Sequence, residues 1–300
     1  MGLLAKIKSK LQHYFMEEDW NIGLIDKPIK QLFSDPTFFD EIQWVEKGKD
    51  YFLADPFPIP NSSMVLCEYY SFSERIGKIV QFDAAKTPVE LSSIGIESET
   101  HLSYPFTFQE GEKLFCIPES SAREDLRLYA FSEGRFVEEK LLMKGEDIVG
   151  GTIIHHDDLY YLFCTKARES YGNQDLHIYF SSKLGSEWKA HSQNPHKSNP
   201  RGSRSAGAIF EVEGELYRPA QNCSDSYGKS IVLYKIMELN EKSFKEEEFM
   251  ELKADTFGRY KNGIHTINAF GDKTLIDGKR SYFSFLKAIR LLSAKMKSKV

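Results

Sequence analysis

The chain has 300 residues, of which 41% are hydrophobic and 28% are charged, and its formal net charge is −5. This composition is typical of a globular protein with one large domain or two small ones. Residues 1–14 contain three lysines and residues 279–300 contain seven lysines or arginines, and neither segment contains an acidic residue. The rest of the chain is therefore strongly acidic, which argues against a general nucleic-acid-binding protein.

Residues 1–19 are predicted to form a basic amphipathic helix. Leu3, Leu4, Ile7 and Leu11 follow helical spacing, and lysines stand between them. The sequence contains neither a secretory signal peptide nor an apolar run of 18 residues. We therefore expect a cytoplasmic protein.

Residues 20–283 contain five related units. Each of the first four has an apolar strand, a polar turn and a second apolar strand, over 56–70, 105–120, 151–166 and 207–222. A further strand follows each hairpin, over 78–83, 126–131, 176–181 and 230–236, and a degenerate fifth unit covers 265–285. A period of about 40–50 residues with three or four strands predicts an all-β fold, a five-bladed β-propeller. A β-sandwich is the alternative, but it does not explain a recurring hairpin with constant internal spacing.

Two smaller features fit this repeat. Cys67, Cys116 and Cys164 end equivalent apolar runs, and with Cys223 they form no CxxC pair, so we expect four free thiols. The polar segment 191–205 is interpreted as a long loop between blades.

The propeller geometry predicts a site. The starts of the innermost strands and the ends of the second strands meet at one face of the central channel. The polar residues at these places are Asp55, Glu68, Tyr104, Glu119, Lys166, Arg204, Arg218, Gln221, Asn222, His265 and Asn268. Each has a structural interpretation when taken alone, since Asp-Pro starts turns and a lone histidine is more often structural. Gathered in one funnel, they predict a ligand-binding ring.

Several motifs identify a family resemblance. The segments "WNIGLIDKPI", "FLADPFPI", "YPFTFQEGEKLFCIPES", "SRSAGAIF", "YRPAQNCSDSYG" and "HTINA" resemble the propeller domain at the N-terminus of plant glucosamine inositolphosphorylceramide transferase, which has bacterial relatives. The resemblance covers residues 20–277. More distantly, the arrangement resembles the five-bladed arabinanase and β-xylosidase type of glycoside hydrolase, in which an Asp before a Pro in the first blade is the base.

The resemblance implies carbohydrate chemistry in the funnel. Asp55 matches the base by motif, and Glu119 is its expected partner by geometry, because cleavage through an oxocarbenium-like transition state uses two carboxylates. The other nine polar residues of the ring are expected to bind substrate. The third blade opens with Gly150-Gly151-Thr152, without the further carboxylate of those hydrolases.

Residues 284–300 are predicted to form a second basic amphipathic helix. Phe285, Leu286, Ile289, Leu292 and Met296 form its apolar row. Two basic amphipathic helices suit the surface of an anionic membrane. The alternative is that both helices pack on the propeller and leave their lysines in solvent.

The leading hypothesis is a glycosyltransferase of bacterial cell-surface polysaccharide biosynthesis, with an activated sugar donor and a lipid-linked glycan acceptor as partners. Arg204, Arg218 or Lys166 would hold the donor phosphates, and Asp55 would act as base toward the acceptor. No glycine-rich phosphate loop, DxD pair or metal-ligand spacing is present, so neither a cofactor nor a metal is expected. A glycoside hydrolase of the arabinanase or xylosidase type and a non-catalytic glycan-binding scaffold are the alternatives.

Overall fold

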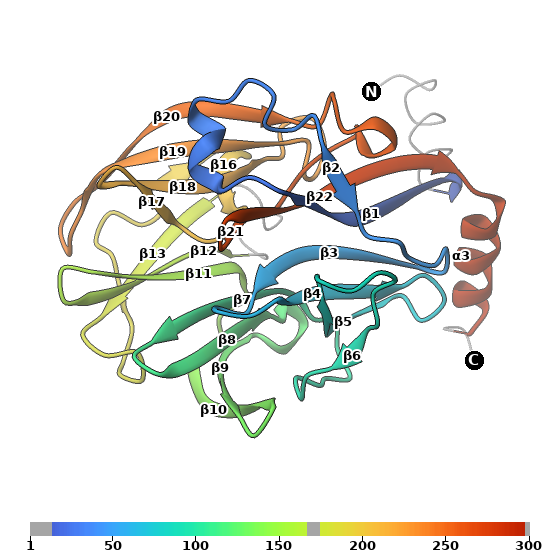
Figure 1. Ribbon diagram of the computed structural model, residues 1–300. Coiled ribbons are helices and arrows are strands. Elements are labelled where there is room, and N and C mark those ends of the chain that lie inside the picture. The colour runs from blue at the N-terminus through green and yellow to red at the C-terminus, as the bar shows by residue number, and fades with distance from the viewer. Residues whose placement is uncertain (1–13, 167–174, 298–300) are drawn as a thin grey trace, which may run out of the picture.

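The chain folds into a five-bladed β-propeller, as the repeats predict. The computed structural model describes residues 14–166 and 175–297. Five antiparallel sheets follow one another around a common centre (Figure 1), and their innermost strands contact one another there. The repeats therefore predicted both the fold class and the number of blades.

The first four blades are continuous in sequence. Blade one contains β3 (Tyr51–Pro58), β4 (Met64–Ser71), β5 (Ile76–Asp83) and β6 (Ser92–Ser93). Blade two contains β7 (Ser103–Glu110), β8 (Lys113–Glu119), β9 (Asp125–Ser132) and β10 (Arg135–Lys144). Blade three contains β11 (Ile148–His156), β12 (Leu159–Lys166), β13 (Asp175–Ser181), β14 (Lys189–Ala190) and β15 (Lys197–Ser198). Blade four contains β16 (Arg201–Ser205), β17 (Phe210–Val212), β18 (Glu215–Asn222), β19 (Ser230–Leu239) and β20 (Phe244–Lys253).

The two ends of the chain combine in blade five. Its strands are β21 (Ile267–Phe270), β22 (Lys273–Phe283), β1 (Met16–Ile25) and β2 (Ile42–Trp44). Strand β1 pairs with β22 along its whole length and so closes the ring between the first and last strands of the chain. Short 3-10 helices lie at Ile29–Phe33, Ser121–Arg123 and Gly258–Tyr260, and a helix, α3, covers Phe285–Lys297.

The start of β1 differs from the helix expected over residues 1–19. Strand pairing begins at Met16, and the buried Asp19 is ion-paired with Lys47 and Arg280, each at 2.7 Å. Pairing with β22 and these ion pairs favour a strand over a helix in residues 16–19. Residues 1–13, which carry most of the expected helix, lie outside the described residues.

Blade four contains the expected hairpin, as β17 and β18, but the segment before it differs from the expectation. The segment 191–205, interpreted as a loop, contains β15 and the inner strand β16. Phe210–Val212 pairs with the first half of β18, and β16 pairs with its second half on the same edge, opposite β19, so β16 and β17 together form the innermost position of the blade. The polar sequence of β16 concealed this strand, because its side chains are buried among polar partners near the centre.

The blades pack through apolar faces. Phe57 of blade one meets Phe106 of blade two edge to face, with ring centroids 5.8 Å apart, and both side chains are buried. The four cysteines are free thiols, as predicted, and three of them are buried. No helix in 14–166 or 175–297 is both long and apolar enough to cross a membrane.

Candidate active site

A β-bulge interrupts the inner strand of each of the first three blades. The residue at the bulge has a positive φ in each case: Asp55 (51°), Tyr104 (44°) and Gly150 (62°). Proline follows Asp55 and Tyr104, and proline suits a bulge because it has no N–H to leave unpaired. The sequence Ala-Asp-Pro, expected at the start of a strand, therefore lies inside β3, which begins at Tyr51.

The bulge amides hold three buried carboxylates. The N–H of Asp55 donates to Oδ2 of Asp277 at 3.1 Å, and the N–H of Tyr104 donates to Oδ2 of Asp55 at 3.1 Å. The N–H of Gly150 donates to Oε2 of Glu119 at 2.7 Å. Each carboxylate accepts this bond from the next blade around the ring. The bulges thus give buried charges the hydrogen bonds that water would otherwise supply.

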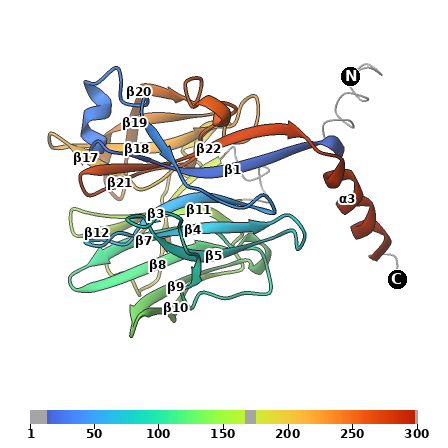
Figure 2. The ribbon, with the colours of Figure 1, turned by 45° about the vertical axis from the view of Figure 1, so that its right-hand side comes forward.

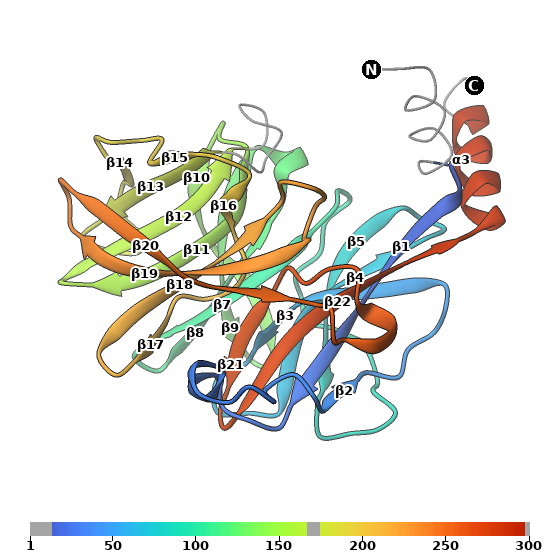
Figure 3. The same cartoon turned by 90° about the horizontal axis from the view of Figure 1, so that it is seen from above.

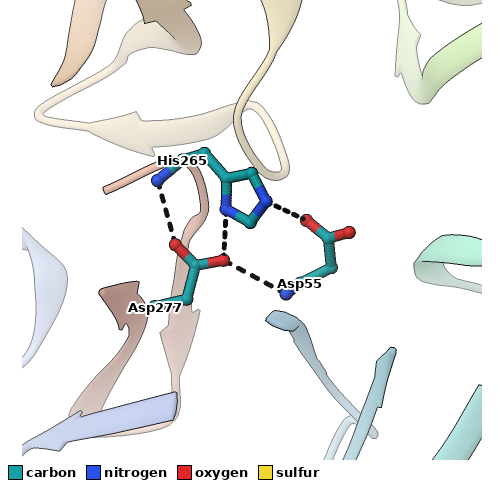
Figure 4. A group of neighbouring side chains, drawn as sticks. All are labelled: Asp55, His265 and Asp277. Atoms are coloured by element: carbon teal, nitrogen blue, oxygen red, sulfur yellow. Dashed lines mark hydrogen bonds and ion pairs between the residues drawn. The ribbon is translucent and has the colours of Figure 1, made fainter. Parts of the chain in front are cut away.

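Asp277, His265 and Asp55 form a closed cluster at the centre, in which each residue contacts the other two (Figure 4). Oδ2 of Asp277 lies 2.5 Å from Nδ1 of His265, and its Oδ1 accepts the backbone N–H groups of His265 and Thr266 at 2.9 and 3.0 Å. Nε2 of His265 lies 3.7 Å from Oδ1 of Asp55, which also accepts a 2.7 Å hydrogen bond from the hydroxyl of Thr266. The imidazole therefore stands between two carboxylates.

Two aromatic rings enclose His265. Trp20 stacks on the imidazole with ring centroids 3.9 Å apart, and Tyr227 contacts it edge-on at 5.3 Å. Burial disfavours the protonated imidazole, but the charges of Asp277 and Asp55 outweigh burial and raise the pKa of His265 above its usual value. The histidine is thus suited to carry a positive charge beside Asp55.

Glu68 is the second carboxyl group beside Asp55. It lies opposite Ala54 in the β3–β4 ladder, next to the bulge, and its Oε1 is 3.4 Å from Nε2 of His101. Burial, reinforced by the charge of Asp55, raises the pKa of Glu68 well above its usual value. Burial also raises the pKa of Asp55, which His265 partly offsets. Glu68 is therefore the carboxyl group that favours its protonated form, and Asp55 is the one that has His265 beside it.

Glu119, the expected catalytic partner, is held by Arg204. The Nη2 atom of Arg204 donates to both carboxylate oxygens at 3.0 and 2.9 Å, and the two side chains are only 10% and 11% exposed. Burial opposes the charge of the guanidinium, but Glu119 holds the pKa of Arg204 above its usual value. The Tyr227 ring lies 5.5 Å from this guanidinium. Glu119 is thus an ion-pair partner in this structure, and Glu68 is better placed to carry a proton.

Three other predicted residues are buried in the scaffold around the centre. The hydroxyl of Tyr104 lies 2.9 Å from that of Thr152, and it also bonds to the backbone of blade four. Asn268 donates to the carbonyl of Pro56 at 2.8 Å, and Gln221 donates to a carbonyl of β16 at 3.1 Å. Tyr104 and Asn268 thus connect different blades, and Gln221 joins two strands of blade four, so all three hold the centre together.

The remaining three predicted residues have partners away from the central carboxylates. Arg218 is ion-paired with Glu246 of β20 at 2.7 Å, and Lys166 is ion-paired with Glu146 at 3.0 Å. Asn222 donates a hydrogen bond to Glu251 of β20 at 3.0 Å. The structure therefore brings together Asp55, Glu68, Glu119, Arg204 and His265, and it engages Arg218, Lys166 and Asn222 elsewhere.

Asp55, His265 and Asp277 also offer potential metal ligands, with their ligand atoms within 4.8 Å of one another. The oxygens of Asp277 already accept three backbone N–H groups. Oδ2 of Asp277 and Nδ1 of His265 are in ion-pair contact at 2.5 Å, so each atom already has a charged partner. The arrangement therefore fits proton storage better than metal coordination.

Comparison with known proteins identifies the family. Residues 48–270 match the family described as the N-terminal region of glucosamine inositolphosphorylceramide transferase 1. The chain belongs to this family. It is 33% identical over 164 residues to glucosamine inositolphosphorylceramide transferase 1 of Oryza sativa subsp. japonica, a match that covers 52% of this chain and 22% of that protein. The Arabidopsis thaliana protein of the same name is 32% identical over 228 residues, which cover 71% and 29% of the two chains. The matches span less than a third of these relatives.

Several solved structures of glycoside hydrolases have the same fold as this chain. A GH43 β-1,3-galactosidase has a TM-score of 0.52 and 13% identity, covering 70% of this chain and 48% of that chain. An exo-β-1,3-galactanase from Clostridium thermocellum gives 0.51 and 12%, covering 69% and 53%, and a β-xylosidase gives 0.52 and 12%, covering 77% and 92%. These likenesses confirm the propeller. The family relationship confirms that the chain is related to glycosyltransferases.

Three residues of the centre were not predicted: Asp277, Trp20 and Tyr227. The fifth repeat contains a signal for Asp277, because "KTLID" aligns with "MVLCE", which ends at Glu68. Tyr227 lies in the quoted segment "YRPAQNCSDSYG", but nothing in a loop sequence indicates that its ring reaches His265. Trp20 reaches the centre only because β1 joins blade five.

Proposed function

We propose that this chain catalyses sugar transfer at the propeller centre, with Asp55 as the general base. Asp55 would accept the proton of an acceptor hydroxyl as that oxygen attacks the anomeric carbon of the donor sugar. The bond from that carbon to the donor phosphate breaks, and the phosphate leaves with the electron pair. The observation that carries the proposal is the Asp277–His265 pair behind Asp55, which places a positive charge against a buried carboxylate.

Arg204 is the proposed cation for the donor phosphate. It is the residue of the expected set Arg204, Arg218 and Lys166 that lies among the central carboxylates. Its guanidinium already bonds to Glu119, so a phosphate would share the cation with that carboxylate. Arg218 and Lys166 are paired with Glu246 and Glu146 and have no role in this proposal.

The proposed substrates are an activated sugar donor and a glycan acceptor carried on a lipid. The names of the plant relatives contain glucosamine, inositolphosphorylceramide and transferase, which supports a sugar donor and a lipid acceptor. The match to only part of those proteins leaves the sugar and the acceptor to experiment. A role in assembling a lipid-linked cell-surface polysaccharide on the cytoplasmic side of a membrane agrees with this chemistry.

Glycoside hydrolysis is the second candidate. Burial and the charge of Asp55 raise the pKa of Glu68, so this side chain would act as the acid while Asp55 activates water. A non-catalytic glycan-binding propeller is the third candidate. It is favoured by the burial of Asp55, Glu119 and Arg204, because a substrate would have little access to these residues.

A transfer assay separates the three candidates. Purified protein is incubated with a panel of nucleotide-activated sugars, with and without lipid-linked glycan acceptors, and the glycolipid and free-sugar products are quantified. Sugar transfer predicts acceptor-dependent glycolipid, lowered at least about 100-fold in Asp55→Asn. The exposed Asp272→Asn is the matched control and should keep full activity.

The other outcomes assign the other functions. Free sugar released from the lipid-linked glycan in the absence of any nucleotide-activated sugar would indicate a glycoside hydrolase. Saturable glycan binding without any product would indicate a binding module. Full transfer activity in Asp55→Asn would exclude Asp55 as the base and overturn the proposed mechanism.

A further inference from the structure

The C-terminal helix α3 presents an unusual apolar surface. Of the eleven large hydrophobic side chains exposed in the described chain, five lie in ten consecutive residues. They are Phe283, Phe285, Leu286, Ile289 and Leu292, with exposed fractions of 56%, 68%, 67%, 57% and 56%. The other six lie in β9, β10, β19, β20 and the loop after β18. We call the five residues from Phe283 to Leu292 named above the α3 surface.

The helix is held to the propeller by its basic side chains. Nζ of Lys287 donates to the carbonyl of Met16 at 2.6 Å, Arg290 is ion-paired with Glu17, and its guanidinium lies 4.9 Å from the Phe72 ring. A helix that docks on its own domain normally buries its apolar face and exposes its charges. Here the apolar row faces outward, and α3 extends from the end of β22 away from the blades (Figure 2).

Aromatic contacts give the α3 surface a fixed base. Phe15 stacks on Phe283 with centroids 5.4 Å apart and contacts Phe285 edge-on at 6.0 Å, while Phe283 and Phe285 are 4.8 Å apart. The pairing of Met16 with Phe283 keeps the N-terminal strand beside the start of the helix (Figure 3). Both ends of the described chain therefore meet at one edge of the molecule.

Charge selects the occupant of this surface. Residues 285–297 contain four lysines or arginines and no acid, and residues 1–14 contain three lysines and no acid, although the whole chain is net negative. Lys279 and Arg280, which precede the helix, have their partners within the propeller. A second copy would bring two such basic regions together and oppose its own docking. An anionic bilayer offers both an apolar interior and negative headgroups.

We infer that the α3 surface binds the interface of an anionic phospholipid bilayer. The five apolar side chains enter the region between headgroups and acyl chains, and the net positive charge of the α3 sequence attracts the anionic headgroups. Arg290 of α3 contacts Phe72, which directly follows β4. Glu68 lies near the end of the same strand, so α3 is at the end of blade one that carries Glu68. The inference concerns where the protein works and does not depend on sugar transfer.

Vesicle flotation tests the inference with the full chain. The protein is floated with vesicles of phosphatidylcholine plus phosphatidylserine, and with vesicles of phosphatidylcholine alone. Wild-type protein should bind the anionic vesicles, and Leu286→Glu with Ile289→Glu should lower partitioning at least about tenfold, because two side chains no longer leave water. Raising salt from about 0.1 M to about 1 M should also release it, since the Debye length falls from about 10 to about 3 Å.

A double variant elsewhere provides the control. Val137→Glu with Met237→Glu changes two strand residues of similar exposure, 47% and 50%, and should float like the wild type. Light scattering on the eluted proteins reports their oligomeric state. Equal flotation of the α3 variant and the control would overturn the inference. A wild-type dimer that the α3 substitutions dissociate, without vesicle binding, would also overturn it and assign the surface to a second copy.

Discussion

Replacing Glu119 by glutamine should destabilise the protein far more than the same change in an exposed ion pair. Arg204 and Glu119 are 11% and 10% exposed, and glutamine would leave the guanidinium buried without its charge partner. Removing one partner of a buried pair costs about 3–5 kcal/mol, a large part of the 5–15 kcal/mol typical of a folded domain. The pair Arg201–Glu248 is 30% and 45% exposed, so Glu248→Gln should cost at most about 1 kcal/mol.

Urea unfolding of the two variants measures this difference. The free energy of unfolding, extrapolated to water, should be lower in Glu119→Gln than in Glu248→Gln by at least about 2 kcal/mol. The double variant Glu119→Gln with Arg204→Met should recover part of the loss, because it leaves no buried charge alone. Equal stability of the two single variants would refute the structural assignment of this pair and return Glu119 to the catalytic candidates.

Three further predictions concern the other central groups. Burial raises the pKa of Glu68 above its usual value of 4.5, so the stability that its proton contributes is complete below that pH and is lost as the pH rises. Urea titrations at about pH 5 and 8 should therefore show that the free energy of unfolding falls less between these pH values in Glu68→Gln than in the wild type. Asp277→Asn should lower the pKa of His265, because the charge of Asp277 helps to raise it, and an unchanged imidazole titration by NMR would contradict the ion pair. Gly228→Ala should cost about 1–3 kcal/mol, because φ is 62° and a Cβ would lie 2.7 Å from Trp20 and 2.9 Å from His265, whereas Gly214→Ala, with φ of 80° but open space, should cost less.

The fold could be predicted because each repeat is recognisable from the local order of its apolar and polar residues. Cys67, Cys116 and Cys164 pair across the ladder with Val80, Tyr129 and His177, thirteen residues later in each case. Alternating apolar strands with a constant spacing specify this hairpin-plus-strand unit without knowledge of distant contacts. The same pattern located Asp55, Glu68 and Glu119 near the centre.

The ion pairs of the centre could not be predicted in the same way. Glu119 and Arg204 are 85 residues apart, and no local pattern indicates which cation of blades three and four turns inward. Arg218 lies in a quoted family motif, yet it pairs with Glu246 of its own blade. Where several cations and carboxylates are available, their pairing depends on backbone bulges and burial, which a single sequence does not specify.

The three equivalent bulges carry different residues at the position with positive φ: Asp55, Tyr104 and Gly150. Gly150 adopts the same positive φ without a side chain, so the bulge itself requires only a glycine. A larger residue in this conformation costs about 1–3 kcal/mol. At Tyr104 the side chain offsets this cost through a buried hydroxyl bonded to Thr152. At Asp55 the strain is combined with desolvation of a charge that faces His265. The carboxylate of Asp55 also accepts the N–H of Tyr104 and the hydroxyl of Thr266, so it has a structural role as well. The proposal of Asp55 as the base therefore depends on the imidazole of His265, 3.7 Å away, which the other two bulge residues do not have beside them.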